Sequence, residues 1–295
     1  MRLALVGNPS VGKSLIFNQL TGLGVEVSNY PGTTVELQRG NTCFQREMIE
    51  LVDLPGIYSL DGDSDEESLV RRFLDLKDTD VIIAVVNVTR LERNLYLLLQ
   101  VAEYGLPMVV VLNMADEAVK QGFEIDTGPL RDLLGVEVIL TAASQGKSID
   151  RIIPAALAAT RPSKVEVPYD HHVEAAVRSL GKMFPADRKE SIRALQGFGD
   201  NPEMLEAART IADEIESRHR MTAAQIIAAN RHNFAHQIAD LTITEEASLP
   251  RTDLDGILTR VFPGIPILIG ILVGMLLVVF IVGSFLEEVI VGIFN

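Results

Sequence analysis

The sequence GNPSVGKS at residues 7–14 constrains the fold more than any other feature of the chain. It follows the apolar run LALV and opens a helical pattern, which is the strand–loop–helix context that a phosphate-binding loop requires. Its glycines let the backbone wrap an anion, and amides at the helix start point toward that anion. Lys13 is expected to bridge the β- and γ-phosphates, and the Ser14 hydroxyl to ligate Mg²⁺. The predicted phosphate site comprises Gly7, Asn8, Pro9, Ser10, Val11, Gly12, Lys13 and Ser14.

Apolar runs and helical patterns alternate through the first 160 residues. Short, β-branched runs predict strands buried on both faces at 3–6, 48–53, 81–88, 108–114 and 136–140. Helical patterns separate several of them, at 13–20, 91–104, 128–134 and 149–159. The alternation predicts an α/β fold with a mostly parallel, doubly wound sheet, in which ligands bind at the C-terminal ends of the strands.

The motif Asp53-Leu54-Pro55-Gly56 follows one of these strands. An aspartate here can hold Mg²⁺ through a water molecule, and the Gly56 amide can turn toward a γ-phosphate. A DxxG sequence alone is usually a turn, but its order after a phosphate-binding loop favours a functional interpretation. The predicted site therefore includes Asp53, Leu54, Pro55 and Gly56.

The motif Asn113-Met114-Ala115-Asp116 ends another apolar strand. The Asp116 carboxylate can accept hydrogen bonds from N1–H and N2–H₂ of guanine, whereas adenine offers neither donor. Sites built on such bonds reject a mismatched analogue by about 10⁴. Asn113 is expected to brace the loop between the base and phosphate segments, and amides after the strand VEVIL to meet the guanine O6. This part of the predicted site comprises Asn113, Met114, Asp116, Thr141, Ala142 and Ala143.

The segment NYPGTTVE at residues 29–36 lies between the first two motifs. A loop threonine there can donate its hydroxyl to Mg²⁺ only when the γ-phosphate is present, which is an order–disorder switch. Thr34 is the first choice for this role and Thr33 the second, and Gly32 belongs to the same nucleotide-binding loop.

A run without charge extends from residue 265 to 285, which is the length that a helix needs to cross a bilayer. Arg251 and Arg260 precede it, so residues 1–260 are expected on the cytoplasmic side of the cell membrane. The alternative is a buried core helix, although such helices rarely run so long without a charge. The start of the chain, MRLALVG, is too short for the apolar region of a signal peptide.

The remaining domain organisation is predicted from the hydrophobic pattern and the charge of the chain. Residues 1–162 form the α/β domain, 163–250 a small all-helical domain with no clear strand from about 171 to 248, and 251–295 the segment leading into the membrane. The net charge is −14, so nucleic acid is not an expected partner. The single cysteine, Cys43, excludes an intrachain disulfide and is expected to be a strand residue without chemistry.

The motifs in this order resemble the GTPase superfamily of P-loop proteins. More narrowly, GNPSVGKS with FNQLTG, NYPGTTVE, VDLPGIYSL and NMAD resembles the N-terminal G domain of the FeoB ferrous-iron transporters. In that family a helical domain and the first membrane span follow. The resemblance implies a Mg²⁺-dependent GTPase of low turnover that regulates iron uptake, with Lys13, Thr34 and Gly56 in catalytic roles. The alternative is a membrane-anchored regulatory or assembly GTPase without a transport role.

The resemblance also implies partners and cofactors. GTP, GDP and the membrane are expected, together with further transporter spans or copies of the chain and a small cytoplasmic accessory protein. Many family members carry an asparagine that helps to bind an activating K⁺ where this chain has Ser10. A serine is shorter and lacks the amide oxygen, which weakens the expectation of K⁺ activation. Ile57 stands where Ras-like enzymes place a water-orienting glutamine, so intrinsic hydrolysis is expected to be slow.

Other polar groups carry weaker predictions. His232 and His236 have the i, i+4 spacing of metal ligands but are expected on a solvated helix face, and the adjacent His171 and His172 are expected to point in different directions. The acidic run at residues 61–67 is expected to be a solvated loop, and Glu287 with Glu288 a charged stop at the bilayer edge.

Overall fold

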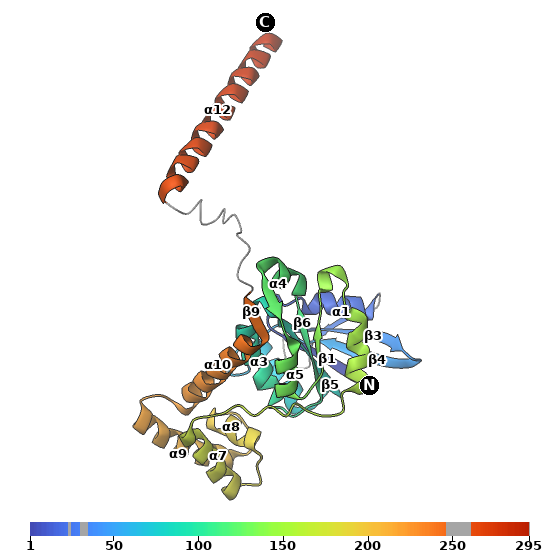
Figure 1. The fold of residues 1–295 in the computed structure, drawn as a ribbon, viewed down its shortest axis with the longest axis vertical. Helices are drawn as coiled ribbons and strands as arrows, with labels where there is room; N and C mark the ends of the chain where they lie inside the picture. Colours follow the sequence, from blue (N-terminus) through green and yellow to red (C-terminus); the bar gives the residue numbers. More distant parts are fainter. Residues whose placement is uncertain (23–24, 30–34, 246–260, 295) are drawn as a thin grey trace. The chain divides into compact units, whose positions relative to one another are not determined.

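The computed structural model describes residues 1–22, 25–29, 35–245 and 261–294, and the chain divides into compact units at residues 1–246 and 247–295 (Figure 1). The α/β and helical segments both lie in the first unit. The boundary predicted between them at residue 162 therefore falls inside one compact body and stays a prediction.

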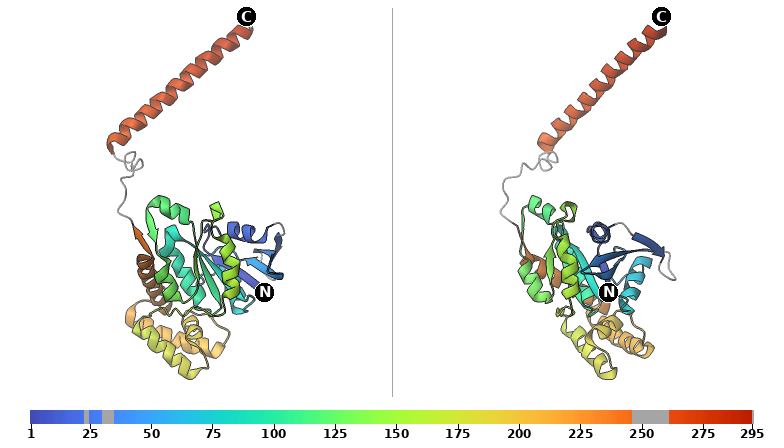
Figure 2. Two further views of the ribbon diagram at one scale, coloured as in Figure 1. Left: turned by 45° about the vertical axis from the view of Figure 1, so that its right-hand side comes forward. Right: turned by 90° about the vertical axis from the view of Figure 1, so that its right-hand side faces the viewer.

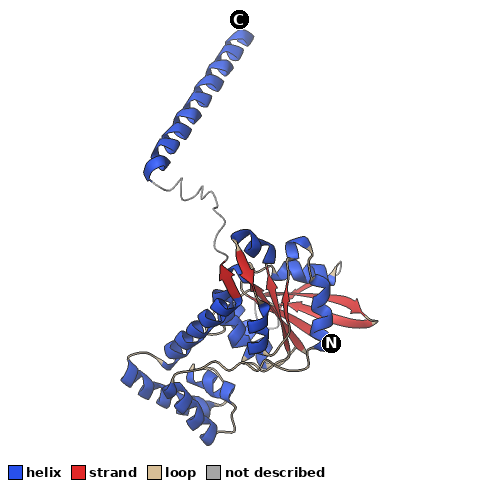
Figure 3. Cartoon of the chain, viewed as in Figure 1, coloured by secondary structure: helices blue, strands red, loops and turns tan. Residues whose placement is uncertain are grey.

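A seven-stranded sheet forms the centre of the first unit (Figure 3). Its strand order is β2-β3-β4-β1-β5-β6-β8, and the pairs from β4 to β8 are parallel. The strands are β1 (Arg2–Gly7), β2 (Val25–Asn29), β3 (Glu36–Phe44), β4 (Glu47–Asp53), β5 (Val81–Asn87), β6 (Met108–Asn113) and β8 (Val138–Leu140). The mostly parallel α/β fold predicted from the sequence is thus confirmed, and β2 and β3 add an antiparallel edge that was not predicted.

Helices cover both faces of the sheet (Figure 2). On one face, side chains such as Ile16, Phe17 and Ile152 pack against the inward residues of β1, β4 and β5. These side chains come from α1 (Lys13–Thr21) and α6 (Ile152–Ala158). The other face packs against α2 (Asp65–Asp75), α3 (Leu91–Ala102) and α5 (Thr127–Leu134), and α10 (Ala223–Thr242) lies against α3 and α5. Both faces are apolar, which explains the near-continuous hydrophobic strands.

Shorter elements lie outside the seven-stranded sheet. They are α4 (Ala115–Gln121), β7 (Phe123–Ile125), β9 (Ile243–Glu245) and the 3₁₀ turns η1 (Val88–Arg90), η2 (Ala143–Gln145) and η3 (Ile149–Arg151). Strand β9 pairs antiparallel with β7. The expectation of no strand between residues 171 and 248 is therefore wrong at its end, because a three-residue strand is too short to show a hydrophobic period.

The helical segment contains α7 (His171–Met183), α8 (Arg188–Leu195) and α9 (Pro202–His219), and continues into α10. Each helix begins at a capping residue, which fixes its start. Asp170 caps α7 and Asn201 caps α9, while Asp187 and Thr222 form capping boxes with Glu190 and Gln225. Val173, Ala176, Val177 and Leu180 share one face of α7 and are buried.

The second unit contains helix α12 (Val261–Phe294). Among the described residues, one helix is long and apolar enough to cross a membrane, at Gly264–Gly283 with a mean hydropathy of 3.2 and no buried residue. Phe262 departs from helical geometry, so the regular helix begins after it. Pro266 stands in the first turn, where a missing amide costs little. The alternative of a buried core helix does not hold for this segment in the described chain.

Candidate functional site

The predicted motifs gather at one edge of the sheet. The phosphate-binding loop follows β1, the DxxG motif follows β4, NxxD follows β6 and residues 141–143 follow β8. These strands are parallel, so their C-terminal ends share an edge. Gly32, Thr33 and Thr34 lie outside the described residues, and their roles stay predictions.

The backbone of the phosphate-binding loop takes conformations that few side chains allow. Gly12 has φ +85°, and a Cβ on it would lie 2.3 Å from Asn113 Nδ2. A Cβ on Gly7 would lie 2.3 Å from the carbonyl oxygen of Val85. Ser10 adopts φ 61°, an uncommon left-handed conformation for a serine. The two motif glycines are thus required by the loop's close packing against β5 and Asn113.

Lys13, Ser14 and Asp53 form one polar cluster. The Lys13 ammonium donates to the Asp53 carboxylate and to the Leu54 carbonyl, and the Lys13 and Asp53 side chains are 9% and 5% exposed. The Ser14 hydroxyl donates to Asp53 Oδ2 at 2.9 Å. The Ser14 and Asp53 oxygens are hard ligands of the kind that Mg²⁺ takes, so this donor set fits that ion. A phosphate that binds Lys13 replaces its contact to Asp53 and frees the carboxylate.

The DxxG segment lies directly against the phosphate-binding loop. The amide of Leu54 donates to the Leu5 carbonyl at 3.2 Å, and the amide of Ile57 donates to the Gly7 carbonyl at 3.3 Å. A Cβ on Gly56 would lie 3.0 Å from Pro9 Cα, so only glycine fits there without a shift. The Ile57 side chain is buried in the core and presents no polar group to the site.

Asn113 connects three segments of the site. Its Nδ2 donates to the Val11 carbonyl at 2.9 Å, while Oδ1 accepts from the Ala143 amide at 3.0 Å and from the Thr141 hydroxyl at 3.1 Å. Asn113 is 2% exposed, so these bonds are shielded from water. The side chain therefore fixes the phosphate-binding loop relative to the loop after β8.

The amides of residues 141–143 bond within the protein. Thr141 donates to Leu112 at 2.8 Å, Ala142 donates to Lys147 at 3.4 Å and Ala143 donates to Asn113. These bonds give the segment a bracing role in the loop. A contact from these amides to a base stays a prediction.

Asp116 lies in the first turn of α4 and is half-buried. Its Oδ2 accepts from the Ser144 hydroxyl at 3.0 Å and from Gln145 Nε2 at 3.3 Å. Partial desolvation opposes ionisation, but the Ser144 bond, backbone amides and Lys120 together hold the pKa of Asp116 below its usual value. The carboxylate is therefore ionised at neutral pH and acts only as an acceptor. Ser144 ends the predicted segment Thr141-Ala142-Ala143-Ser144, although its hydroxyl bond to Asp116 was not predicted. Gln145 was not among the predicted site residues, and only its place next to this segment points to it.

The sheet order, the loop between β1 and α1, and the two further motifs at the same edge together define a P-loop G domain. A comparison with known families assigns the chain to one group within this class. Residues 1–156 match the family described as Ferrous iron transport protein B. The chain therefore belongs to the FeoB family, as the sequence motifs indicate.

Individual relatives extend the similarity beyond the G domain. The Fe(2+) transporter FeoB of Shigella flexneri is 34% identical over 308 residues, which cover 97% of this chain and 39% of that protein. This chain thus spans about two fifths of that relative's length.

Solved structures cover the first unit. An S. thermophilus NFeoB mutant bound to GDP has 30% identity and a TM-score of 0.74, over 83% of this chain and 100% of that one. The cytosolic domain of the T. maritima FeoB iron transporter in a GMPPNP form has 28% identity and a TM-score of 0.73, over 83% and 99% of the two chains.

Proposed function

We propose that the first unit binds GTP with Mg²⁺ and hydrolyses it slowly, and that this cycle regulates ferrous-iron uptake through a membrane protein. The observation that carries the proposal is the position of Asn113. Its three hydrogen bonds join the phosphate-binding loop to the loop that holds Asp116 ionised. A nucleotide that spans both loops therefore contacts one preorganised edge of the sheet with both its phosphates and its base. The relatives with GDP and GMPPNP in their structures support this reading.

Guanine selection is assigned to Asp116. An ionised carboxylate accepts from both donors of the guanine edge, and adenine places an acceptor where guanine has N1–H. The Ser144 and Gln145 bonds occupy Oδ2 and hold the carboxylate in one orientation. The resulting preference for guanine is about 10⁴, as for other sites in which the mismatch leaves buried polar groups unpaired.

The phosphate end is assigned to Lys13, Ser14 and Asp53. Lys13 neutralises the β- and γ-phosphates, while Ser14 and Asp53 hold Mg²⁺, with Asp53 acting through water. When bound, Mg²⁺ supplies charge neutralisation at the phosphates. Thr34 is proposed to join this site in the GTP state, and the Gly56 amide to face the γ-phosphate. K⁺ activation is not part of the proposal, because Ser10 offers no amide oxygen.

Hydrolysis is proposed to be slow because the buried Ile57 cannot orient water. By comparison with unassisted small GTPases, the turnover is about 10⁻³ s⁻¹. Single-turnover hydrolysis of GTP by the detergent-solubilised chain tests this value. Without an added partner, a rate near the unassisted value supports the proposal, and a rate well above about 1 s⁻¹ contradicts it.

The membrane role is proposed for the helix at Gly264–Gly283, with residues 1–260 on the cytoplasmic side. A single apolar helix cannot line a polar pathway, so iron passage requires further spans or further copies of the chain. The similarity to the Shigella flexneri transporter over nearly the whole chain favours this function over an assembly GTPase without a transport role.

Coupling from the nucleotide edge to the helical segment is proposed to run through Asp61, which lies on the segment after the DxxG motif. Tyr96 donates to Asp61 Oδ2 at 2.7 Å and Gln196 donates to Oδ1 at 2.9 Å. Arg231 of α10 lies 3.6 Å from the same carboxylate and pairs with Glu103 at 2.7 Å. The expectation that residues 61–67 are a solvated loop holds for the exposed residues 63 and 64 but is wrong at both ends, because Asp61 binds α3, the end of α8 and α10, and α2 begins at Asp65.

Arg231 can respond to a movement of the segment that carries Asp61. Its side chain is 2% exposed, and its Nε and Nη1 make no hydrogen bond within the described residues. A small displacement of Asp61 toward Arg231 converts the 3.6 Å contact into a hydrogen bond. Nucleotide-dependent movement after Gly56 thus changes a buried contact on α10.

Hydrogen exchange tests this coupling. In the wild-type chain we expect the protection of residues 188–196 and 223–242 to differ between the GDP and GMPPNP states. Asp61→Asn should reduce that difference, whereas Asp63→Asn, on the same segment, should not. Equal protection in both nucleotide states of the wild type would contradict the proposed route.

A further inference from the structure

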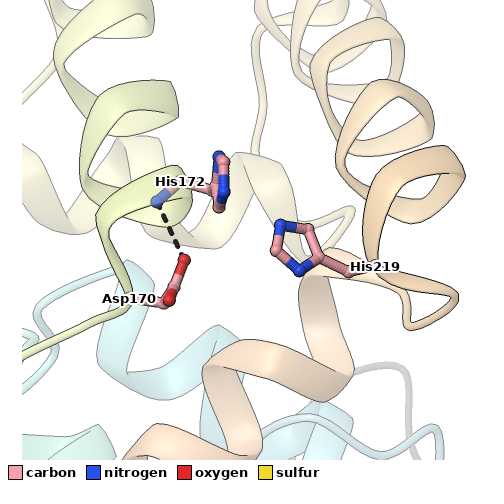
Figure 4. A group of neighbouring side chains, drawn as sticks. All are labelled: Asp170, His172 and His219. Atoms are coloured by element: carbon pink, nitrogen blue, oxygen red, sulfur yellow. Dashed lines mark hydrogen bonds between the residues drawn. The ribbon is translucent and has the colours of Figure 1, made fainter.

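A cluster of potential metal ligands lies in the helical segment, away from the nucleotide edge. Figure 4 shows Asp170, His172 and His219 converging between the start of α7 and the end of α9. One ligand atom from each side chain lies within 4.8 Å of the others. His172 and His219 are 47 positions apart in the sequence, so only the packing of α7 against α9 brings them together.

The two imidazoles lie against each other without a polar partner between them. Their ring centroids are 4.4 Å apart at an interplanar angle of 67°. Within the part of the chain that the structure describes, neither imidazole makes a side-chain hydrogen bond. His171 also contacts His172, with centroids 3.8 Å apart, although adjacent helical positions were expected to diverge. His171 stands at the first position of α7, where the helical spacing of side chains is not yet established.

One carboxylate oxygen of Asp170 caps α7, and the other faces His171. Its Oδ1 accepts from the His172 amide at 2.9 Å and so caps α7. Its Oδ2 lies 3.5 Å from His171 Nδ1, beyond hydrogen-bond distance for a strong bond. The cap fixes the Asp170 backbone relative to His172, and the carbonyl end of α9 adds negative potential near His219. The nearby Arg218 is paired with Glu214 at 2.5 Å, which offsets its charge.

We propose that Asp170, His172 and His219 bind one divalent transition-metal ion of the first row, such as Fe²⁺ or Zn²⁺. Two imidazoles and one carboxylate suit these ions, whereas Mg²⁺ and Ca²⁺ prefer oxygen ligands alone. Metal–ligand bonds of about 2.1 Å require the ligand atoms to approach by about 1 Å, which rotation of these partly buried side chains allows. The bound ion joins the start of α7 to the end of α9 and leaves coordination positions open to solvent.

Cobalt titration of the detergent-solubilised chain tests this site, because Co²⁺ reports its ligands by visible d–d absorption. The titration is done with GDP and Mg²⁺ at saturation, and Zn²⁺ is then added as a competitor. The wild type should bind one Co²⁺ that Zn²⁺ displaces. His172→Ala and His219→Ala should each weaken binding at least tenfold, and Asp170→Asn, which keeps the helix cap, should do the same.

His236→Ala provides the matched control, because His236 is an exposed histidine of α10 outside the cluster. It should leave Co²⁺ affinity within about twofold. Unchanged affinity in the His172 and His219 variants, equal loss in the His236 variant, or no Co²⁺ binding by the wild type would overturn the proposal. If the metal-free variants have the same melting temperature as the metal-free wild type, the loss of binding does not result from unfolding. The site shares no residue with the nucleotide edge, so Lys13→Ala should leave it unaffected.

Discussion

Two buried cations, Lys13 and Arg231, pair with carboxylates at the end of β4 and on the segment that follows it, and their surroundings differ. Lys13 and Asp53 meet at the nucleotide edge, where a flexible ammonium contacts one carboxylate and one carbonyl. Arg231 lies in the helical segment, where its planar guanidinium is held between Glu103, Gln196 and Asp61. Although burial disfavours its charge, these acidic neighbours raise the pKa of Arg231. A ligand can separate Lys13 from Asp53, whereas Arg231 keeps its pair with Glu103 at 2.7 Å when Asp61 moves.

The comparison shows that buried charge by itself does not mark a binding site. Lys13 and Asp53 belong to motifs at the ends of parallel strands, where a nucleotide can replace their contact. Arg231 belongs to no motif and is enclosed by α3, α8 and α10. Changes at the two sites should therefore separate binding from stability.

The largest expected effect is on base selection at the nucleotide edge. Asp116→Asn removes the acceptor for one guanine donor, so the preference for GDP over ADP should fall by up to about 10⁴. The new amide can donate to the C2 carbonyl of xanthine, so affinity for XDP should rise. Competition binding measures all three nucleotides. Glu117→Gln, an exposed change in the same turn, should keep the wild-type order, and an unchanged preference in Asp116→Asn would remove guanine recognition from this residue.

The next largest effect is on stability at the helical segment. Arg231→Met leaves Glu103 and Asp61 without their buried partner and should lower the free energy of unfolding by about 3–5 kcal/mol. Chemical denaturation measures the change. Arg218→Met removes an exposed pair with Glu214 and should cost less than about 1 kcal/mol. Equal losses in the two variants would show that burial does not distinguish these arginines.

Lys13→Ala should lower nucleotide affinity more than stability, which is the opposite of Arg231→Met. It removes charge-assisted hydrogen bonds to phosphate worth about 1.5–3 kcal/mol, so GDP affinity should fall by about 10- to 150-fold. The free energy of unfolding without nucleotide should change much less than in Arg231→Met. Calorimetric titration and denaturation of the same sample measure both quantities. A Lys13 variant that unfolds readily but binds GDP normally would reverse the roles of the two pairs.

The smallest expected effect concerns a partly exposed pair in the helical segment. Hydrogen bonds from Arg188, at 2.5 and 2.6 Å, lower the pKa of Glu174. A lowered folded-state pKa stabilises the fold above the unfolded value, near 4.5, and this contribution is lost as the pH falls through the folded pKa. Glu174→Gln should therefore cost about 0.5–1 kcal/mol at pH 7 and nothing at low pH. Denaturation at both pH values checks it, and a pH-independent difference would contradict the assignment.

The strands that carry the motifs could be predicted because they are buried on both faces, which leaves nearly continuous apolar runs at β1, β5 and β6. In β3 only Cys43 was expected to be a strand residue, which is confirmed, and the extent of the strand was missed because ELQRGNTCF has too few apolar residues to show an alternating pattern. Helix α2 was missed although Ser64 and Glu67 form a readable capping box, because the acidic run was taken for a loop.

The contacts between distant residues could not be predicted. A buried arginine such as Arg231 has no sequence signature that separates it from a surface arginine. The proximity of Ser144 to Asp116, and of His172 to His219, depends on how the loops and helices pack. Motifs therefore located the candidate nucleotide edge, and packing revealed the polar groups that support it.

The proposed function depends on a guanosine nucleotide that binds across the edge that Asn113 holds together. Calorimetric titration of the detergent-solubilised wild-type chain with GDP and with ADP, in Mg²⁺, measures it directly. We expect one GDP per chain and an ADP affinity weaker by about 10⁴. Equal affinities for the two nucleotides, or no uptake of GDP, would contradict it.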